Sequence, residues 1–178
     1  MNEISIHGKI FIPYIPFDKI EERTKSITKD LEKEYKGKNV MFLGILNGAF
    51  MFMSELMRHY ENACKISFVK VSSYHGMESA GKIHELIGLN EDLSDYDVII
   101  VEDIIDTGLT IISIIDAVKK LNAKSVATAT LLFKKEALKI DFTPDYIGFE
   151  IPNRFVLGFG LDYDGLGRNH KDIYQLKP

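Results

Sequence analysis

Apolar residues recur along the chain in short runs that alternate with amphipathic segments. Between residues 17 and 36 charged residues dominate, and Ile20, Ile27 and Leu31 fall on one face of a predicted helix. Gly37 suits the C-terminal cap of this helix. Runs typical of buried strands cover 39–46, 64–72, 98–101, 125–133, 145–150 and 155–161, and further helical patterns cover 49–60 and 109–121. Strands that alternate with helices predict right-handed βαβ units and an α/β fold with a mostly parallel sheet.

The last two predicted strands, 145–150 and 155–161, have no helix between them. We therefore expect them to leave the main sheet and to form a small hood with the N-terminal residues. The expected organisation is one domain over 1–178. Its core is a mostly parallel twisted sheet flanked by helices at about 37–145, and its hood comes from about 1–16 and 146–178. No linker-like segment, low-complexity tract or internal repeat divides the chain.

Composition narrows the class of protein without changing this picture. The 178 residues suit a single domain, and the net charge of −4 gives no overall positive field that would attract nucleic acid or anionic lipid. The single cysteine, Cys64, excludes an internal disulfide and fits a reducing compartment. The N-terminal residues lack a signal-peptide pattern, and no apolar run approaches the about 20 residues that cross a bilayer. We therefore expect a cytoplasmic protein with no membrane or nucleic-acid partner.

The most informative segment is 98–110, where a predicted buried strand runs directly into Glu102 and Asp103. Asp106 follows, and then Thr-Gly-Leu-Thr opens a predicted helix. In an open α/β sheet, ligands bind beyond the carboxyl ends of the strands. The segment thus combines carboxylates, which suit a cation or a proton, with a glycine-containing helix start, which suits a phosphate.

Each group in this segment also has a plain structural interpretation. Asp106 or Thr107 can simply cap the following helix, and two acids after a strand often form a solvated loop. Beside a phosphate-binding turn, however, Glu102 and Asp103 suit vicinal ribose hydroxyls or Mg²⁺ bound to them. An unpaired Asp106 would repel the phosphate, which favours a role as a general base or acceptor near the reacting group. There is no Walker sequence, and the glycine pair at 158–160 is only a weak match to a dinucleotide site.

Residues 98–110 closely resemble the phosphoribosyl pyrophosphate signature of the type I phosphoribosyltransferases, and within them the hypoxanthine-guanine branch. The resemblance extends over nearly the whole chain and in the same order. Residues 44–53 resemble the pyrophosphate loop and its helix, 71–74 the start of the flexible catalytic loop, 131–135 the strand with the purine-reading lysine, and 145–163 the purine-binding hood. Five segments in register argue against a chance match, and they imply the type I phosphoribosyltransferase fold.

At the acidic segment, the resemblance implies a role for each matching residue. Glu102 and Asp103 would bind the ribose hydroxyls directly or through Mg²⁺, and Asp106 would accept or share the N7 proton of the purine as general base. The 5′-phosphate would be held by the backbone and hydroxyl groups of the turn, namely Asp106, Thr107, Gly108, Leu109 and Thr110. The ambiguity between cation and anion is then explained by one substrate that carries both hydroxyls and a phosphate.

Outside that segment, the resemblance implies further contacts with the base and the pyrophosphate. Lys134 would donate to O6 of a 6-oxopurine, Phe155 would stack on the base, and Val156 would offer backbone groups to its edge. On the pyrophosphate side the implied residues are Asn47, Gly48, Asp162 as ligand of a second Mg²⁺, and Arg168, with Ser73 and Tyr74 in the catalytic loop. The plain alternatives are a solvated Lys134, a core Phe155 and a surface ion pair between Asp162 and Arg168.

Two positions depart from the family pattern. The pyrophosphate loop usually carries a lysine where this chain has Asn47, and the peptide bond before it is often cis in the family. An arginine that some relatives place four residues beyond the purine lysine is replaced here by Leu138. Lys135 and Lys139 are the nearby candidates to compensate. We expect the loss of the lysine charge at Asn47 to affect pyrophosphate affinity or contacts between subunits.

The reaction implied by the resemblance is transfer of the 5-phosphoribosyl group from phosphoribosyl pyrophosphate to N9 of hypoxanthine, and of guanine. The products would be IMP or GMP and pyrophosphate, as in purine salvage. Two alternatives stay open: a regulator of the same fold that senses nucleotides and binds RNA, and an enzyme of the same class that prefers xanthine. The acidic balance argues against the first. A homodimer or homotetramer is expected, with the apolar residues 49–57 as a candidate contact.

Overall fold

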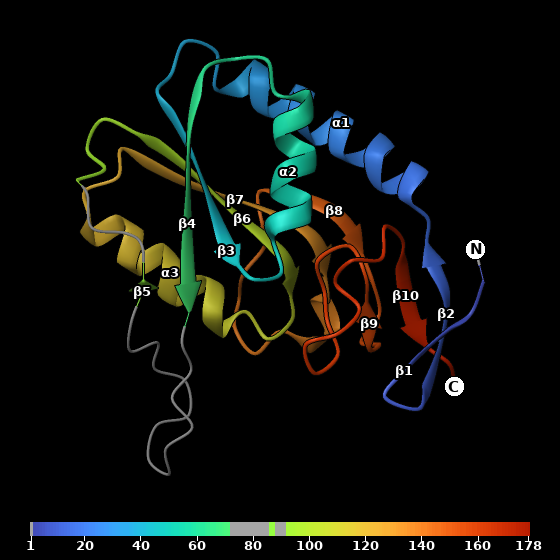
Figure 1. Ribbon diagram of the computed structural model, residues 1–178. Helices are drawn as coiled ribbons and strands as arrows, with labels where there is room; N and C mark the ends of the chain where they lie inside the picture. The colour runs from blue at the N-terminus through green and yellow to red at the C-terminus, as the bar shows by residue number, and fades with distance from the viewer. Residues whose placement is uncertain (1, 72–85, 88–91) are drawn as a thin grey trace.

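A six-stranded sheet forms the centre of the computed structural model, which describes residues 2–71, 86–87 and 92–178 (Figure 1). In the order of the sheet, its strands are β5 (Leu86–Ile87), β4 (Cys64–Val71), β3 (Val40–Leu46), β6 (Asp97–Ile105), β7 (Ser125–Phe133) and β8 (Tyr146–Glu150). All neighbouring strands run parallel except β5, which is antiparallel to β4. The predicted α/β fold with a mostly parallel sheet is therefore confirmed.

Helices cover both faces of this sheet. On one face lie α1 (Phe17–Glu34) and α2 (Phe50–His59), and on the other lies α3 (Leu109–Lys120) (Figure 1). Side chains alternate along each strand, so Phe42 enters the core under α1 and α2 while Met41 enters the core under α3. Because both faces are buried, the central strands are apolar at nearly every position, which is why they stand out in the sequence.

The two ends of the chain meet in a second, antiparallel sheet of four strands. Its order is β1 (Ile4–Ile6), β2 (Lys9–Ile15), β10 (Ile173–Leu176) and β9 (Val156–Leu157). Figure 1 shows this hood at the side of the main sheet, with both termini on it. A small core holds it together, consisting of Ile6, Phe11, Leu157 and Tyr174.

The predicted strand at 145–150 was assigned to the wrong sheet. It does not belong to the hood but forms β8, the edge of the main sheet, where it pairs in parallel with β7. A parallel crossover needs about a dozen residues but no particular helix, and here a 3₁₀ turn, η1 (Lys135–Ala137), lies in the connection. Arg23 of α1 donates to the carbonyl oxygens of Ile147 and Gly148 and so fastens this edge.

The second predicted hood strand is shorter than the pattern at 155–161 suggested. It ends as β9 at Leu157 because Gly158, Phe159 and Gly160 all have positive φ angles, which strand geometry excludes. The strands β1, β2 and β10 were not predicted as individual elements. β1 and β10 have only three and four residues, and the seven-residue β2 contains Pro13, which disfavours a strand prediction.

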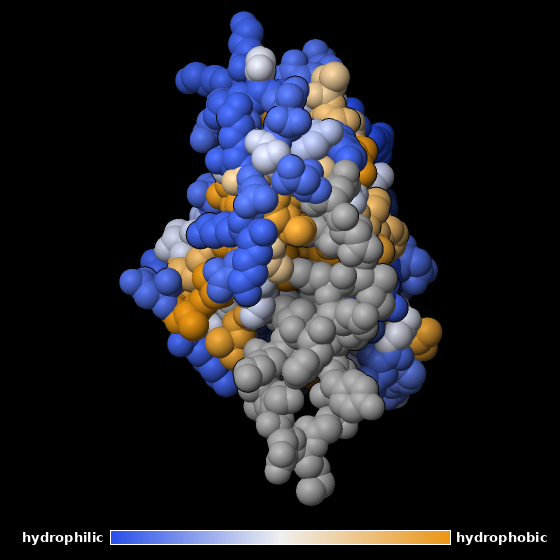
Figure 2. All heavy atoms as spheres, turned by 90° about the vertical axis from the view of Figure 1, so that its left-hand side faces the viewer, coloured by the Kyte–Doolittle hydropathy of each residue, from blue (hydrophilic) through white to orange (hydrophobic). Residues whose placement is uncertain are grey.

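At the opposite edge of the main sheet, Lys70 and Val71 of β4 pair with β5 in the described part of the chain. Ile66 and Phe68 of the same strand are 46% and 38% exposed. Figure 2 looks onto this side, where hydrophobic groups interrupt a mainly hydrophilic surface. Among the helices in the described ranges, none is both long and apolar enough to cross a membrane.

Candidate active site

The acid-bearing strand extends further than the sequence suggested. β6 runs to Ile105 rather than ending at residue 101, because β7 continues beside it and keeps the ladder of hydrogen bonds. Glu102 and Asp103 therefore lie within the strand, and the turn itself comprises Asp106 to Gly108. The two carboxylates are held by the sheet and not by a loop.

The turn leads into α3 without a side-chain cap. Gly108 is the N-cap residue, with a φ of 82°, and among the described residues no side chain caps the N–H groups of the first turn of the helix. The alternative that Asp106 or Thr107 serves as the helix cap is therefore wrong. The unpaired N–H groups at this helix start, together with the hydroxyl of Thr107, are available to an anion.

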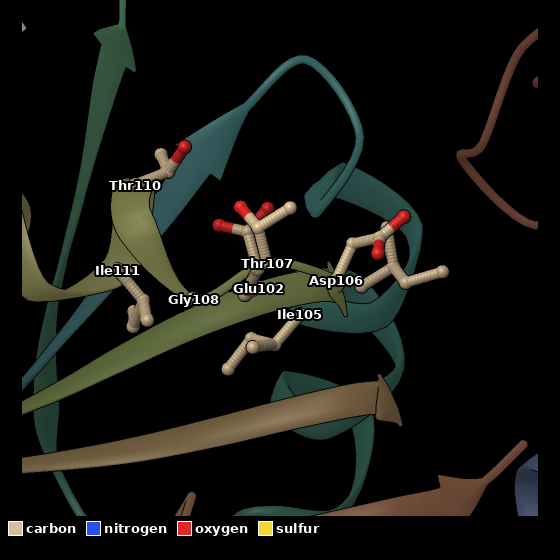
Figure 3. A pocket seen from close by; sticks show the side chains of 8 residues that line it. Glu102, Ile105, Asp106, Thr107, Gly108, Thr110 and Ile111 are labelled. Carbon is tan, nitrogen blue, oxygen red and sulfur yellow. The ribbon is translucent and has the colours of Figure 1, made fainter. Parts of the chain in front are cut away.

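A pocket opens at this turn. Figure 3 shows the oxygen atoms of Glu102, Thr107 and Asp106 on one side of it, and the apolar side chains of Ile105 and Ile111 on the other. The complete lining consists of Glu102, Ile104, Ile105, Asp106, Thr107, Gly108, Thr110 and Ile111. Every residue of the turn that we expected at the 5′-phosphate, except Leu109, lines this pocket.

The connection between β7 and β8 packs against the turn at Gly108, whose φ angle lies in the left-handed region. A Cβ atom at Gly108 would lie 2.8 Å from Ile140 and 3.1 Å from Leu138, and the N–H of Lys139 donates to the carbonyl oxygen of Thr107 at 3.0 Å. Leu138, which stands where some relatives have arginine, therefore packs against the turn and belongs to the core under α3. Among the described contacts, none indicates that Lys135 or Lys139 takes over the role of that arginine.

The carboxylates of β6 are strongly influenced by burial. Burial raises the pKa of Glu102 well above its ordinary value, and the adjacent charge of Asp103 adds to the shift. Burial also raises the pKa of Asp103, while hydrogen bonds and the charge of Arg168 oppose that rise. Within the described residues, Oε2 of Glu102 is buried without a hydrogen-bond partner. Two adjacent carboxylates, one with an unsatisfied oxygen, are a donor set that suits Mg²⁺.

Lys134 lies directly beside the turn. Its Nζ atom is 3.0 Å from Oδ2 of Asp106, although the two residues are 28 positions apart. Lys134 is only 7% exposed, so the alternative of a solvated lysine is wrong, whereas the Asp106 side chain is 46% exposed. The pair therefore presents a hydrogen-bond donor and an acceptor next to each other at the turn formed by Asp106 to Gly108, where the phosphate is expected to bind.

The hood contributes an exposed aromatic ring. Phe155 is 46% exposed, so it is not a core residue. The N–H of Leu176 donates to the carbonyl oxygen of Phe155, and Val156 is aligned with Gln175 in the next position of the ladder. Bonded and non-bonded pairs alternate in an antiparallel ladder, so the backbone groups of Val156 point away from β10, off the edge of the sheet. The N–H and C=O groups of Val156 therefore make no hydrogen bond to β10 and could meet the edge of a base, which is the role predicted for this residue.

The predicted pyrophosphate residues converge where the core meets the hood. A Cβ atom at Gly48 would lie 1.7 Å from Oδ2 of Asp103, and one at Gly160 would lie 2.1 Å from the carbonyl oxygen of Gly48. Arg168 donates to the carbonyl oxygen of Gly160 at 2.6 Å and lies 2.7 Å from Oδ1 of Asp162. Gly160 was not among the predicted site residues. The glycine pair at 158–160 was its only signal, and it marks a close approach of two backbones.

Of two further predicted parts of the site, the position of Asn47 is described by the structure and the catalytic loop is not. Asn47 is exposed, and the peptide bond between Leu46 and Asn47 is cis. Ser73 and Tyr74, the predicted residues of the catalytic loop, lie outside the described residues. The described part of the site therefore consists of the acidic segment, the pyrophosphate loop, Lys134 and the hood.

Comparison with known proteins agrees with this fold and site. The family profile of the phosphoribosyl transferase domain matches residues 17–164. A hypoxanthine-guanine phosphoribosyltransferase of Aquifex aeolicus is 36% identical over 174 residues, which are 97% of this chain and 98% of the relative. A crystal structure of a hypoxanthine phosphoribosyltransferase from Staphylococcus aureus has a TM-score of 0.87 and 38% identity, and the match covers 94% of this chain and 91% of that one.

Some relatives are much longer. The bifunctional protein TilS/HprT of Listeria monocytogenes is 38% identical over 175 residues, and the matched region is 98% of this chain but only 27% of that protein. The family profile covers most of this chain, and the relatives of similar length match it over nearly its whole length. The chain therefore belongs to the phosphoribosyltransferase family, in its hypoxanthine-guanine branch.

Proposed function

We propose that this chain is a purine salvage enzyme that transfers the 5-phosphoribosyl group from phosphoribosyl pyrophosphate to N9 of hypoxanthine, and also of guanine. The observation that carries the proposal is the ion pair between Lys134 and Asp106 at the mouth of the phosphate turn. A 6-oxopurine presents an acceptor, O6, next to a donor, the N7–H group. Lys134 and Asp106 offer the complementary donor and acceptor side by side.

This pair also explains which bases fit. Adenine carries an amino donor where hypoxanthine carries O6, so adenine would place a donor against the buried Lys134 ammonium, which is itself a donor. Phe155 would cover one face of the base, and the free backbone groups of Val156 would meet its edge at C2. Hypoxanthine, guanine and xanthine differ at C2, so Lys134 alone does not discriminate among them.

In the proposed reaction, N9 of the base forms a bond to C1′ of the ribose while the bond from C1′ to the pyrophosphate oxygen breaks. The bonding electrons leave with pyrophosphate. A base that attacks through N9 while protonated at N7 becomes positively charged, and Asp106 takes the N7 proton to give the neutral nucleotide. Lys134 donates to Oδ2 of Asp106 at 3.0 Å, and this contact holds the carboxylate beside the place where N7 of the base would lie.

The remaining residues hold the sugar phosphate. The helix start at Gly108 and the hydroxyls of Thr107 and Thr110 would bind the 5′-phosphate. Glu102 and Asp103 fit Mg²⁺, since Oε2 of Glu102 lacks a partner among the described residues. When bound, Mg²⁺ would neutralise charge on the pyrophosphate, with Arg168 as its protein counterpart. Both oxygens of Asp162 already accept from Arg168 and Gly165, so a second ion there stays a prediction.

The test is an assay of the purified protein with phosphoribosyl pyrophosphate, Mg²⁺ and each of four purines. We expect formation of nucleotide and pyrophosphate in equal amounts with hypoxanthine and guanine, and none with adenine. A higher kcat/KM for xanthine than for hypoxanthine would redirect the proposal to the xanthine-preferring alternative. Absence of turnover with every base, together with binding of RNA in a filter assay, would support the regulatory alternative instead.

A further inference from the structure

The exposed ring of Phe155 rests on two other aromatic rings of the hood. Its centroid lies 5.4 Å from that of Tyr163, with an interplanar angle of 78°, and 6.1 Å from that of Phe11. Phe11 and Tyr163 are also 6.1 Å apart, so the three rings contact one another. Edge-to-face pairs at such distances are a favourable arrangement for aromatic rings. Tyr163 therefore supports the ring that is expected to cover the purine.

Tyr163 is itself held by the N-terminal hairpin. His7, in the turn between β1 and β2, meets its ring edge-on at 5.3 Å and 86°, and Nζ of Lys9 lies 4.8 Å from the ring centroid. Phe11, which also contacts this ring, is fully buried in β2. The first strands of the chain thus fix a residue that lies some 150 positions later in the sequence and one contact away from the base site.

The backbone of Tyr163 is also fixed, by a tight turn. Tyr163 and Leu166 exchange hydrogen bonds of 2.9 and 3.1 Å, and the two residues between them have φ angles of 46° and 85°. This is the pattern of a two-residue hairpin with an Asp-Gly turn. Asp162 and Arg168 flank the same turn and form the ion pair at the pyrophosphate end. One short hairpin therefore joins the two ends of the proposed site.

We propose that Tyr163 is a positioning residue for the purine. It holds the ring of Phe155 in the orientation that stacks on the base, and the N-terminal hairpin holds Tyr163 in turn. This proposal rests on the proposed function, because it takes Phe155 as the stacking residue. Without the Tyr163 ring, the half-exposed Phe155 side chain would be free to change rotamer, and purine binding would have to order it.

The experiment compares Tyr163→Leu, Tyr163→Phe, Phe155→Leu and the double variant of Tyr163→Leu with Phe155→Leu. In Tyr163→Leu, the KM for hypoxanthine should rise about two- to tenfold, the range expected for an aromatic pair, while the KM for phosphoribosyl pyrophosphate and kcat stay near their wild-type values. Tyr163→Phe keeps the ring and should keep the wild-type KM. In the Phe155→Leu background, Tyr163→Leu should add little, because its effect passes through Phe155.

Tyr14→Leu provides the matched control, since it makes the same chemical change in β2 at a ring that packs against the main core. It should leave the KM for hypoxanthine unchanged. Equal rises of both KM values in Tyr163→Leu, or additive effects in the double variant, would overturn the positioning role while leaving the proposed function intact. A wild-type protein without turnover of hypoxanthine would overturn the proposed function, and this proposal with it.

Discussion

The two sides of the proposed site are built in different ways. The core side is one continuous stretch, 102–110, at the end of β6 and the start of α3, and burial raises the pKa values of its two strand carboxylates, Glu102 and Asp103. The hood side is assembled from separate parts: the exposed ring of Phe155, the edge of β9, and the partly exposed pair of Asp162 and Arg168. On the core side the sheet fixes the positions of the functional groups, and on the hood side contacts between side chains do so.

This difference suggests a division of labour. Groups that handle charge, such as the carboxylates of β6, gain strength from a dry environment and from a rigid strand. Groups that cover the face of the base need surface and shape more than burial. Substitutions on the core side should therefore change turnover, phosphoribosyl pyrophosphate binding or, at Lys134 and Asp106, the choice of the base, and those on the hood side should change the affinity for the base.

The largest expected effect follows from Asp106→Asn. The asparagine cannot take the N7 proton, so kcat should fall by about 10² to 10⁴, the range for loss of a general base, while the dissociation constant of the nucleotide changes little. Steady-state kinetics and nucleotide binding would measure both. Asp116→Asn makes the same change on the exposed side of α3 and should be neutral. Unchanged turnover in Asp106→Asn would remove this residue from the base role.

The next effect follows from Gly48→Ala. The added Cβ would overlap Asp103, which must then move from its place beside the pyrophosphate loop. We expect kcat/KM for phosphoribosyl pyrophosphate to fall about 100-fold, as displacements of about 1 Å in a site can cause. Gly37→Ala is the contrast: its φ of 74° disfavours alanine, but a Cβ there meets nothing within 4 Å. It should lower stability by about 1 kcal/mol and leave the kinetics intact. Equal kinetics for both variants would refute the contact argument.

Glu102→Gln should weaken substrate binding by a smaller factor, and it should at the same time stabilise the fold. Loss of the carboxylate should raise the KM for phosphoribosyl pyrophosphate about tenfold, the scale of a lost charged interaction. The same change removes a buried charge with an unsatisfied oxygen. It should raise the free energy of unfolding at neutral pH by about 1 kcal/mol, or Tm by roughly 2–4 °C. A variant that binds as well as the wild type would contradict the role of Glu102.

The pH dependence of stability sharpens this test. Because the pKa of Glu102 is raised in the folded state, the folded protein binds this proton more tightly than the unfolded chain does. The wild type should therefore lose stability as pH rises from the ordinary pKa of glutamate towards the raised pKa, whereas Glu102→Gln lacks this loss. Thermal unfolding measured across this range should show that the Tm values of the wild type and of Glu102→Gln move apart as pH rises. Parallel curves would contradict the raised pKa.

The smallest expected effect follows from Asn47→Lys, which restores the usual residue of the pyrophosphate loop. Asn47 is exposed, so the new charge would be screened by solvent. We expect the KM for phosphoribosyl pyrophosphate to fall only about two- to fivefold, in line with the strength of exposed ion pairs. Added salt should reduce the difference. An increase in KM would show that the loop in this chain is adapted to asparagine.

The sequence predicted best what is local. The buried strands are continuous apolar runs, and the acidic segment lies within a dozen residues, so both could be recognised without knowledge of the fold. The ion pair of Lys134 with Asp106 joins positions 28 apart, and only the resemblance to a family placed them together. The contact of Gly48 with Asp103 leaves no local signal beyond a glycine.

What the sequence did not predict depends on pairing between distant segments. The apolar run at 145–150 fits a hood strand and a sheet edge equally well, and only its partners, β7 and Arg23, decide between them. The hood unites strands from both ends of the chain; three of them have two to four residues, and the fourth, β2, contains a proline. The support of Phe155 by Tyr163 likewise exists only once the ends have met.

The central claim is that Lys134 and Asp106 together read a 6-oxopurine beside a bound sugar phosphate. The most direct test is the ratio of kcat/KM for hypoxanthine to that for adenine, measured with the same phosphoribosyl pyrophosphate and Mg²⁺ concentrations. Sites that read a polar group through buried partners reject the mismatched analogue by about 10⁴ or more, and we expect a ratio of that order. A ratio near one, or a preference for adenine, would contradict the account.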